Sequence, residues 1–239
     1  MSRRLADEYG ILLKNLLEFR GSRTTDFTAA CICSVVPPLT GMFEDLCRRF
    51  FGVTPLLVTS QIDLGMPVRY DNPRDVGADR IVDAVAAVEL YGAPMIVVDL
   101  GTATVFDAVS RDREYLAGPS RRGSTCRRTR CTTTRRSCGG WSWWRRRRPW
   151  GEHDDVVAVG IVLGYAGLVE AMVGRFKAEI GEDARVVGTG GLVTVISDHV
   201  PVFDDINQEL TLVGLDIIYR KNAAGLPSSG ASAGMSRAG

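Results

Sequence analysis

The sequence predicts an α/β protein in which mixed β-sheets are flanked by helices. The first observation is that short β-branched, apolar segments alternate along the chain with amphipathic segments of helical period. The second is the composition, because 45% of the 239 residues are apolar and 24% are charged, as in ordinary globular proteins. This length suits one large domain or two smaller ones. Disordered, collagen-like and coiled-coil proteins are excluded.

The first part of the chain is predicted to begin with a helix. Leucines at helical spacing mark this helix, and a run of β-branched residues marks the strand that follows it and ends before Pro37. Pro67 and Pro73 mark a later loop. In chain order we predict a helix over 5–19, a strand over 27–36, a helix over 39–51, a strand over 55–59, a loop over 66–76 and a helix over 79–91.

The second part of the chain is predicted to begin with two strands joined through Gly101. The segment after residue 223 is rich in Ala, Gly and Ser and has no period, so we expect a disordered tail over 223–239. In chain order we predict strands over 95–99 and 104–110, an optional strand over 114–117, a helix over 159–180, a strand over 185–187, a helix ending near 197, a strand over 200–203 and a helix over 210–222.

The formal charge of +1 is an average over two unlike parts of the chain. Residues 118–150 hold eleven arginines, all four tryptophans and no acidic residue, while the rest of the chain carries a net charge of −10. Arginines beside tryptophans can bind a phosphate backbone and stack on bases. The segment has no period, however, and the acidic remainder would repel nucleic acid, so we do not expect a nucleic-acid partner.

No part of the sequence predicts a membrane-bound protein. A run of about 18 consecutive apolar residues is absent, and the first residues lack the apolar core of a signal peptide. We therefore expect a cytoplasmic protein that has no membrane partner.

The segment from Val97 to Thr104 has the residue types of a compact phosphate site. Asp99 ends a buried strand, and Gly101 allows a tight turn close to a ligand. The hydroxyls of Thr102 and Thr104 can donate to phosphate oxygens, and the carboxylate can hold a cation. The structural alternative is a turn between two hairpin strands, with Asp99 only capping the bend. The segment alone leaves both interpretations open.

The segment from Tyr70 to Arg80 places a carboxylate and a guanidinium at the first turn of a helix. Asp79 can act there as a general base toward a substrate hydroxyl, and Arg80 can pair with an anionic group. Alternatively, Asp79 only complements the helix dipole and Arg80 forms a surface ion pair. A third segment, Thr189 to Gly191, is a glycine turn that suits a nucleotide but also occurs as a plain strand–helix connection.

Several segments occur together in the order found in one family. They are residues 34–40, 70–80, 99–104, 160–165, 189–191 and 210–215. In this order the chain resembles the type III pantothenate kinases, which belong to the superfamily of acetate and sugar kinases and actin. The resemblance implies ATP-dependent phosphorylation of the pantothenate 4′-hydroxyl, the first step of coenzyme A biosynthesis. It also implies a homodimer that uses ATP, Mg²⁺ and a monovalent cation, either K⁺ or ammonium.

The resemblance assigns a role to individual residues. Asp79 is the expected base, and Gly77 and Arg80 belong to the same Gly-x-Asp-Arg motif, whose arginine meets the pantothenate carboxylate. Tyr70 is expected to line the pantothenate pocket, and Asp99 is expected to bind the monovalent cation. The residues expected to bind ATP are Gly101, Thr102, Thr104, Thr189, Gly190 and Gly191.

The fold implied by the resemblance is a pair of duplicated actin-like, ribonuclease H-like domains. We place the pantothenate-side domain over 1–93 and the second domain over 94–222. The family begins with a strand carrying Asp-x-Gly-Asn-Thr, and this chain starts at the following helix. The first domain is therefore expected to be incomplete and the activity low or absent. The alternative is a non-catalytic, pantothenate-kinase-like binding or regulatory protein.

A second departure from the family lies over residues 118–159. The segment has the family's length between Gly118 and Gly160 but a foreign composition, with Arg, Trp, Cys and Thr in no periodic order. A stretch of correct length and wrong content is what two compensating frameshifts in a GC-rich coding sequence would produce. Our hypothesis is therefore a local change of reading frame.

Overall fold

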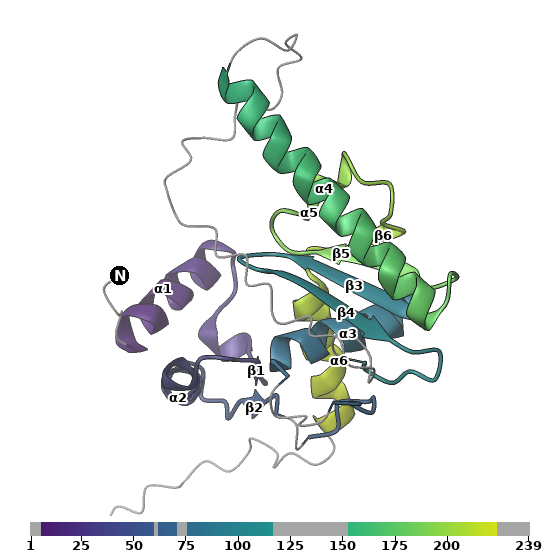
Figure 1. Ribbon diagram of the computed structural model, residues 1–239. Helices are drawn as coiled ribbons and strands as arrows, with labels where there is room; N and C mark the ends of the chain where they lie inside the picture. The colour runs from purple at the N-terminus through teal and green to yellow at the C-terminus, as the bar shows by residue number, and fades with distance from the viewer. Residues whose placement is uncertain (1–5, 60–61, 71–75, 117–152, 224–239) are drawn as a thin grey trace, which may run out of the picture. The chain divides into compact units, whose positions relative to one another are not determined.

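The computed structural model describes residues 6–59, 62–70, 76–116 and 153–223. The chain forms two compact units, each assembled from separate stretches of sequence. The first unit comprises residues 1–65, 77–82 and 215–239, and the second comprises 66–76 and 83–214. Two helices, α3 (Ala78–Tyr91) and α6 (Leu210–Asn222), contribute to both units (Figure 1). The division that we predicted at residue 93 stays a prediction, because compact units need not coincide with duplicated domains.

The second unit is built on a mixed sheet. Among the described residues this sheet has four strands in the order β4-β3-β5-β6. The strands are β3 (Met95–Leu100), β4 (Thr104–Val109), β5 (Arg185–Thr189) and β6 (Asp205–Ile206). β3 pairs antiparallel with β4 and parallel with β5, which pairs parallel with β6. The predicted class, an α/β protein with a mixed sheet and flanking helices, is confirmed.

The long helix α4 (His153–Ile180) covers one face of this sheet (Figure 1). Its buried side chains recur every three or four residues, which places them in one stripe. They are Val162, Ala166, Val169, Val173 and Phe176, and they pack in one cluster with Ile96, Val98 and Leu100 of β3. We predicted that this helix begins at residue 159, but it begins at His153. The last residues of the segment that we took as non-periodic are therefore helical.

The strand that we predicted over 200–203 is wrong, since pairing with β5 starts later. Asp204 receives a hydrogen bond from Val186 through its side chain at 2.7 Å and donates one to the Val186 carbonyl through its backbone at 2.8 Å. The Phe203 ring lies against Gly188, where an added Cβ would be 2.9 Å from the ring. Val200, Val202 and Phe203 thus fill the core from a turn, and the strand ladder begins at Asp205. The preceding helix, α5 (Val193–Ser197), ends where we predicted.

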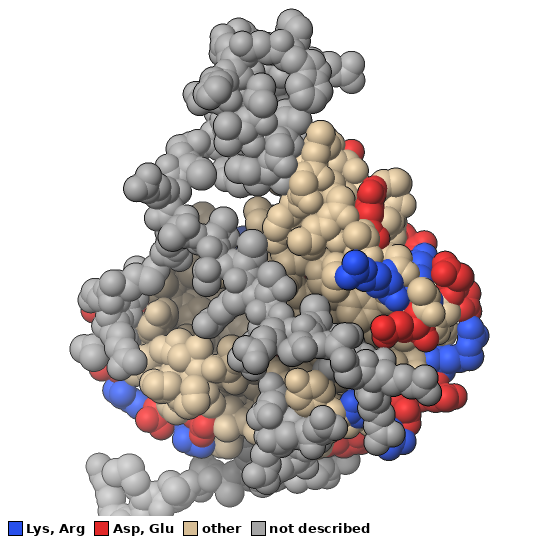
Figure 2. Space-filling model, viewed as in Figure 1, with Lys and Arg blue, Asp and Glu red and all other residues tan. Residues whose placement is uncertain are grey.

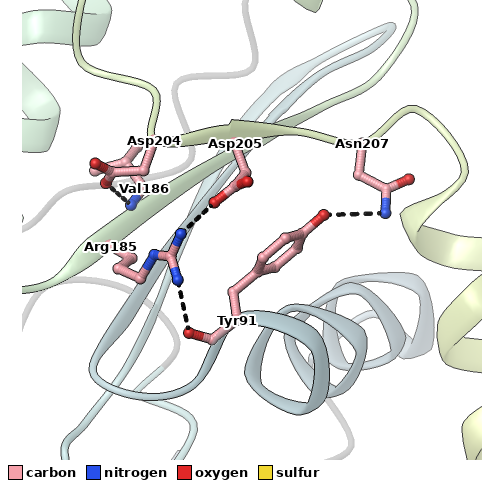
Figure 3. A network of polar contacts seen from close by, with 6 residues as sticks. All are labelled: Tyr91, Arg185, Val186, Asp204, Asp205 and Asn207. Atoms are coloured by element: carbon pink, nitrogen blue, oxygen red, sulfur yellow. Dashed lines mark hydrogen bonds and ion pairs between the residues drawn. The ribbon is translucent and has the colours of Figure 1, made fainter.

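A polar network joins the start of β5 to β6 and to the end of α3 (Figure 3). Arg185 donates to the Asp205 carboxylate at 2.7 Å, and its guanidinium lies 5.8 Å from the centre of the Tyr91 ring. Asn207 donates to the Tyr91 hydroxyl at 3.4 Å. Asp205 is half-buried, and the Arg185 guanidinium also lies over an aromatic ring. We therefore expect this ion pair to contribute more to stability than an ordinary surface ion pair.

Replacing Arg185 with Ala is expected to lower the free energy of unfolding by about 1 kcal/mol. A double-mutant cycle with Asp205→Ala, read by urea denaturation, measures the coupling between the two side chains. Arg220→Ala is the matched control, since Arg220 forms a 2.8 Å pair with Asp216 on an exposed helix face. We expect the control to change stability by less than about 0.5 kcal/mol. Equal losses for Arg185 and Arg220 would contradict the assigned role of the network.

The first unit packs short helices around a minimal parallel pair of strands. Its elements are α1 (Ala6–Phe19), the 3-10 helix η1 (Thr24–Asp26), β1 (Cys31–Ile32), α2 (Pro37–Leu46), the π-helix η2 (Cys47–Phe51) and β2 (Leu56–Leu57). The rings of Tyr9 and Phe43 join α1 to α2 with centroids 5.4 Å apart. An added Cβ on Gly10 would be 2.5 Å from the Phe50 ring, so the glycine is required for this close approach.

The strand that we predicted over 27–36 is reduced to Cys31–Ile32. Its partner β2 pairs with it at two positions only, and Ser34 turns the chain by accepting a hydrogen bond from the Val36 amide at 3.2 Å. The following helix begins at Pro37 rather than residue 39, since proline is well suited to a first helical turn. Burial raises the pKa of the Cys31 thiol to about 11, so it stays protonated at neutral pH.

Charged side chains of both signs lie close together along the margins of the visible described surface (Figure 2). In the second unit, Arg111 donates to the Asp183 carboxylate at 2.7 Å, and this hydrogen bond lowers the pKa of Asp183. Arg113 pairs with Glu89 at 2.7 Å. None of the helices in the described part of the chain is long and apolar enough to cross a membrane.

Candidate active site

The second unit brings two turns together at one edge of its sheet. β3 and β5 are parallel and in a register that pairs Asp99 with Thr189, so the turns that follow these strands leave the sheet at the same edge. β4 is antiparallel to β3, and its first residue, Thr104, pairs with Leu100. The turn between them is tight, because the Gly101 amide donates to the Ala103 carbonyl at 3.2 Å. Two segments predicted for the nucleotide site therefore meet, although Asp99 and Gly190 are 91 residues apart in the chain.

The Asp99 carboxylate lies between the two glycine turns. An added Cβ on Gly101 would be 3.2 Å from Asp99 Oδ1, and one on Gly190 would be 2.5 Å from the same oxygen and 2.6 Å from the Leu100 carbonyl carbon. Gly190 also has a φ of +88°, which side chains rarely adopt. The Leu192 amide donates to the Leu100 carbonyl at 2.9 Å and ties the turns together. The glycines thus form a cradle around a half-buried carboxylate.

The hydroxyls of this site differ in their access to a ligand. Thr102 is exposed in the turn, and Thr104 is half-buried, with its hydroxyl hydrogen bonded to that of Tyr165 on α4. Thr189 is only 3% exposed, so its backbone and the turn at Gly190 are more accessible than its side chain. Thr102 and Thr104 are therefore better placed than Thr189 to meet phosphate oxygens through their side chains.

The first unit holds the residues predicted to act on the substrate. The Gly77 carbonyl accepts hydrogen bonds from Arg80 and Ile81 at 3.2 and 3.4 Å, which starts α3. Asp79 is exposed on the first turn, and its Oδ1 accepts a bond from the Arg80 amide at 2.9 Å. An added Cβ on Gly77 would collide with Asp79 Oδ1. Gly77 therefore leaves the space in which the carboxylate stays accessible to a hydroxyl.

The predicted pantothenate segment, Tyr70 to Arg80, is divided between the two units, and part of it lies outside the described residues. Tyr70 is 43% exposed and belongs to the second unit, whereas Gly77 belongs to the first. Residues 71–75 lie outside the described residues. The same holds for residues 118–152, which make up most of the segment of foreign composition over 118–159, called the Arg/Trp segment below. Tyr165 is a site residue that we did not predict, although residues 160–165 carried part of the resemblance. The feature of the sequence that could have indicated Tyr165 is a hydroxyl-bearing side chain near the apolar stripe of a long helix.

A carboxylate enclosed by glycine turns beyond the ends of parallel strands is typical of α/β proteins that bind nucleotides and other phosphates. The family model described as type III pantothenate kinase matches residues 1–126, a match that ends inside the Arg/Trp segment. The chain belongs to the type III pantothenate kinase family, as the relatives also show.

The relatives are similar over nearly all of this chain. A type III pantothenate kinase from Dehalococcoides mccartyi is 40% identical over 93% of this chain and 85% of its own. Enzymes of the same name from Syntrophobacter fumaroxidans and Myxococcus xanthus are also 40% identical, over 90% and 93% of this chain and 84% and 88% of theirs.

Proposed function

We propose that the chain transfers the γ-phosphoryl group of ATP to the 4′-hydroxyl of pantothenate, the step that opens coenzyme A biosynthesis. Membership of the type III pantothenate kinase family supports this function. The observation that carries it is the meeting of two glycine turns around Asp99. Phosphoryl transfer needs positioned phosphates and neutralised charge more than covalent chemistry. The turns can position the phosphates, and bound cations would neutralise their charge.

The substrate side of the proposal rests on the start of α3. Asp79 is exposed, so it can accept the proton of the attacking hydroxyl as the oxygen bonds to phosphorus and ADP leaves. Arg80 is assigned to the pantothenate carboxylate, because a guanidinium can form paired hydrogen bonds with it. Tyr70 is assigned to the wall of the pocket, where its exposed ring can contact the substrate.

The nucleotide side of the proposal rests on the glycine turns. Thr102 and Thr104 are assigned to the phosphates, and the turn over 189–191 to the adenosine. Mg²⁺ bound to ATP would neutralise part of the phosphate charge. Asp99 is assigned to the monovalent cation. The space beside Gly190 is small enough for one Cβ to fill, and the Asp99 carboxylate and the Leu100 backbone line it. Such a space fits an ion that prefers oxygen ligands.

The proposed reaction is tested with the full chain, pantothenate, ATP, Mg²⁺ and K⁺. Since the sequence predicts low activity, we expect phosphopantothenate to appear slowly by mass spectrometry, together with an equal amount of ADP. ADP release without phosphopantothenate would reject pantothenate as the acceptor. Pantothenate binding without any turnover would instead favour the non-catalytic binding protein that the sequence leaves open.

Replacing Asp99 with Asn is expected to weaken activation by K⁺, since the carboxylate charge attracts the cation. The K⁺ concentration for half-maximal rate should rise at least about tenfold, which corresponds to roughly 1.4 kcal/mol. Asp198→Asn removes an equal charge from an exposed position and is the matched control. An Asp99→Asn variant with an unchanged K⁺ dependence would remove Asp99 from the cation site.

We also infer duplicated actin-like domains, a homodimer and a cytoplasmic location from the family resemblance. Light scattering tests the dimer, which should have twice the 26.0 kDa mass of one chain. The frameshift hypothesis now concerns residues 118–152, because α4 already includes His153. The end of the family match at residue 126 supports it. Translation of the coding DNA in its other frames should restore a family-like glycine loop, and its absence from every frame would reject the hypothesis.

A further inference from the structure

The hydroxyl of Tyr165 forms a hydrogen bond with the Oγ1 atom of Thr104. Thr104 is the first residue of β4 and follows the turn that begins at Gly101. Its backbone position is fixed by pairing with Leu100, the residue that follows Asp99 in β3. The contact therefore joins a helix of the core to a side chain at the rim of the candidate phosphate site.

Packing holds Tyr165 in place on α4. Val162, Ala166 and Val169 are buried on the same stripe of the helix, and Tyr165 is half-buried against their cluster. The tyrosine thus has a ring held by packing and a hydroxyl at the site. A rigid phenol of this kind is a suitable partner for a threonine hydroxyl, which otherwise rotates about χ1.

We propose that Tyr165 is a positioning residue for ATP, which holds the Thr104 hydroxyl in the orientation that meets a nucleotide phosphate. This inference rests on the proposed function, in which Thr104 contacts the phosphates. When Tyr165 donates its proton to Thr104 Oγ1, the Thr104 proton points to another acceptor, and a phosphate oxygen is a strong one. Tyr165 acts through Thr104 and touches no reacting atom.

The test uses Tyr165→Phe in the full chain, because this change keeps the ring and removes the hydroxyl alone. We expect KM for ATP to rise about three- to tenfold, as for the loss of one ordinary hydrogen bond. KM for pantothenate should stay within twofold, and Tm should fall by less than about 4 °C. A helix that had merely lost packing would lose stability without this selective change in KM for ATP.

A cycle with Thr104→Ala shows whether Tyr165 acts through Thr104. In the Thr104→Ala background, Tyr165→Phe should leave KM for ATP within twofold of the single Thr104 variant. Tyr219→Phe removes the hydroxyl of a half-buried tyrosine on α6, in the first unit, and is the matched control with an unchanged KM. Fully additive effects of the two substitutions would overturn the inference.

Calorimetric titration with Mg·ATP separates this inference from the proposed reaction. If both proteins turn over and Tyr165→Phe has the same KM for ATP and the same Kd for ATP as the wild type, the inference alone is overturned. Absence of pantothenate phosphorylation, with Kd for ATP raised about three- to tenfold in Tyr165→Phe, overturns the reaction and supports the inference. A wild-type chain that binds no Mg·ATP overturns both.

Discussion

Replacing Asp79 with Asn is expected to lower kcat for pantothenate phosphorylation by about 10²- to 10⁴-fold, the usual contribution of a general base. The two side chains have nearly the same shape, and the amide oxygen of asparagine can still accept the hydrogen bond that the Arg80 amide gives to Asp79 at 2.9 Å. The start of α3 is therefore preserved while the proton acceptor is lost. Steady-state assays with both substrates saturating measure the effect, since a loss of binding would appear in KM instead.

The matched control for Asp79 is Asp216→Asn. Asp216 is an exposed carboxylate on α6 in the same unit, where it pairs with Arg220. Its replacement removes the same charge and should leave kcat within twofold. Full turnover by Asp79→Asn would show that another group accepts the proton.

Replacing Gly190 with Ala is expected to disrupt the nucleotide side of the site. The new Cβ would be 2.5 Å from Asp99 Oδ1 and 2.6 Å from the Leu100 carbonyl carbon, which belongs to a buried strand. The φ of +88° adds backbone strain. We expect the free energy of unfolding to fall by more than about 2 kcal/mol, and Tm by at least about 4 °C. Loss of the cradle should also raise KM for ATP at least about a hundredfold, equivalent to two steps of 1.4 kcal/mol.

Gly191→Ala is the matched stability control for Gly190. An added Cβ at Gly191 has nothing within 4 Å, and its φ lies outside the left-handed range. The free energy of unfolding, measured by thermal denaturation, should therefore change by no more than about 0.5 kcal/mol, the usual range for surface substitutions. Similar Tm values for the two variants would contradict the close approach of Gly190 to Asp99.

Two helices and the three longest strands, β3, β4 and β5, lie within two residues of their predicted bounds. The helix over 210–222 has the predicted bounds, and α3 begins one residue before the prediction. Helical periodicity and end signals lie within the segment itself. By contrast, the predicted strands over 27–36 and 200–203 are shortened or displaced. A strand needs a partner at the same register, and a run of apolar residues also arises from a turn that fills a core, as Phe203 does.

The sequence alone predicted the family, which its relatives confirm, and the candidate segments for its chemistry. Local residue types at short spacing, such as Gly77 with Asp79, are readable without a fold. The meeting of Asp99 with Gly190 depends instead on the parallel register of β3 and β5, which long-range hydrogen bonds set. The contact of Thr104 with Tyr165 depends in turn on how α4 packs on the sheet. Such contacts join residues that are far apart in the chain, so no local sequence pattern predicts that they lie close together in space.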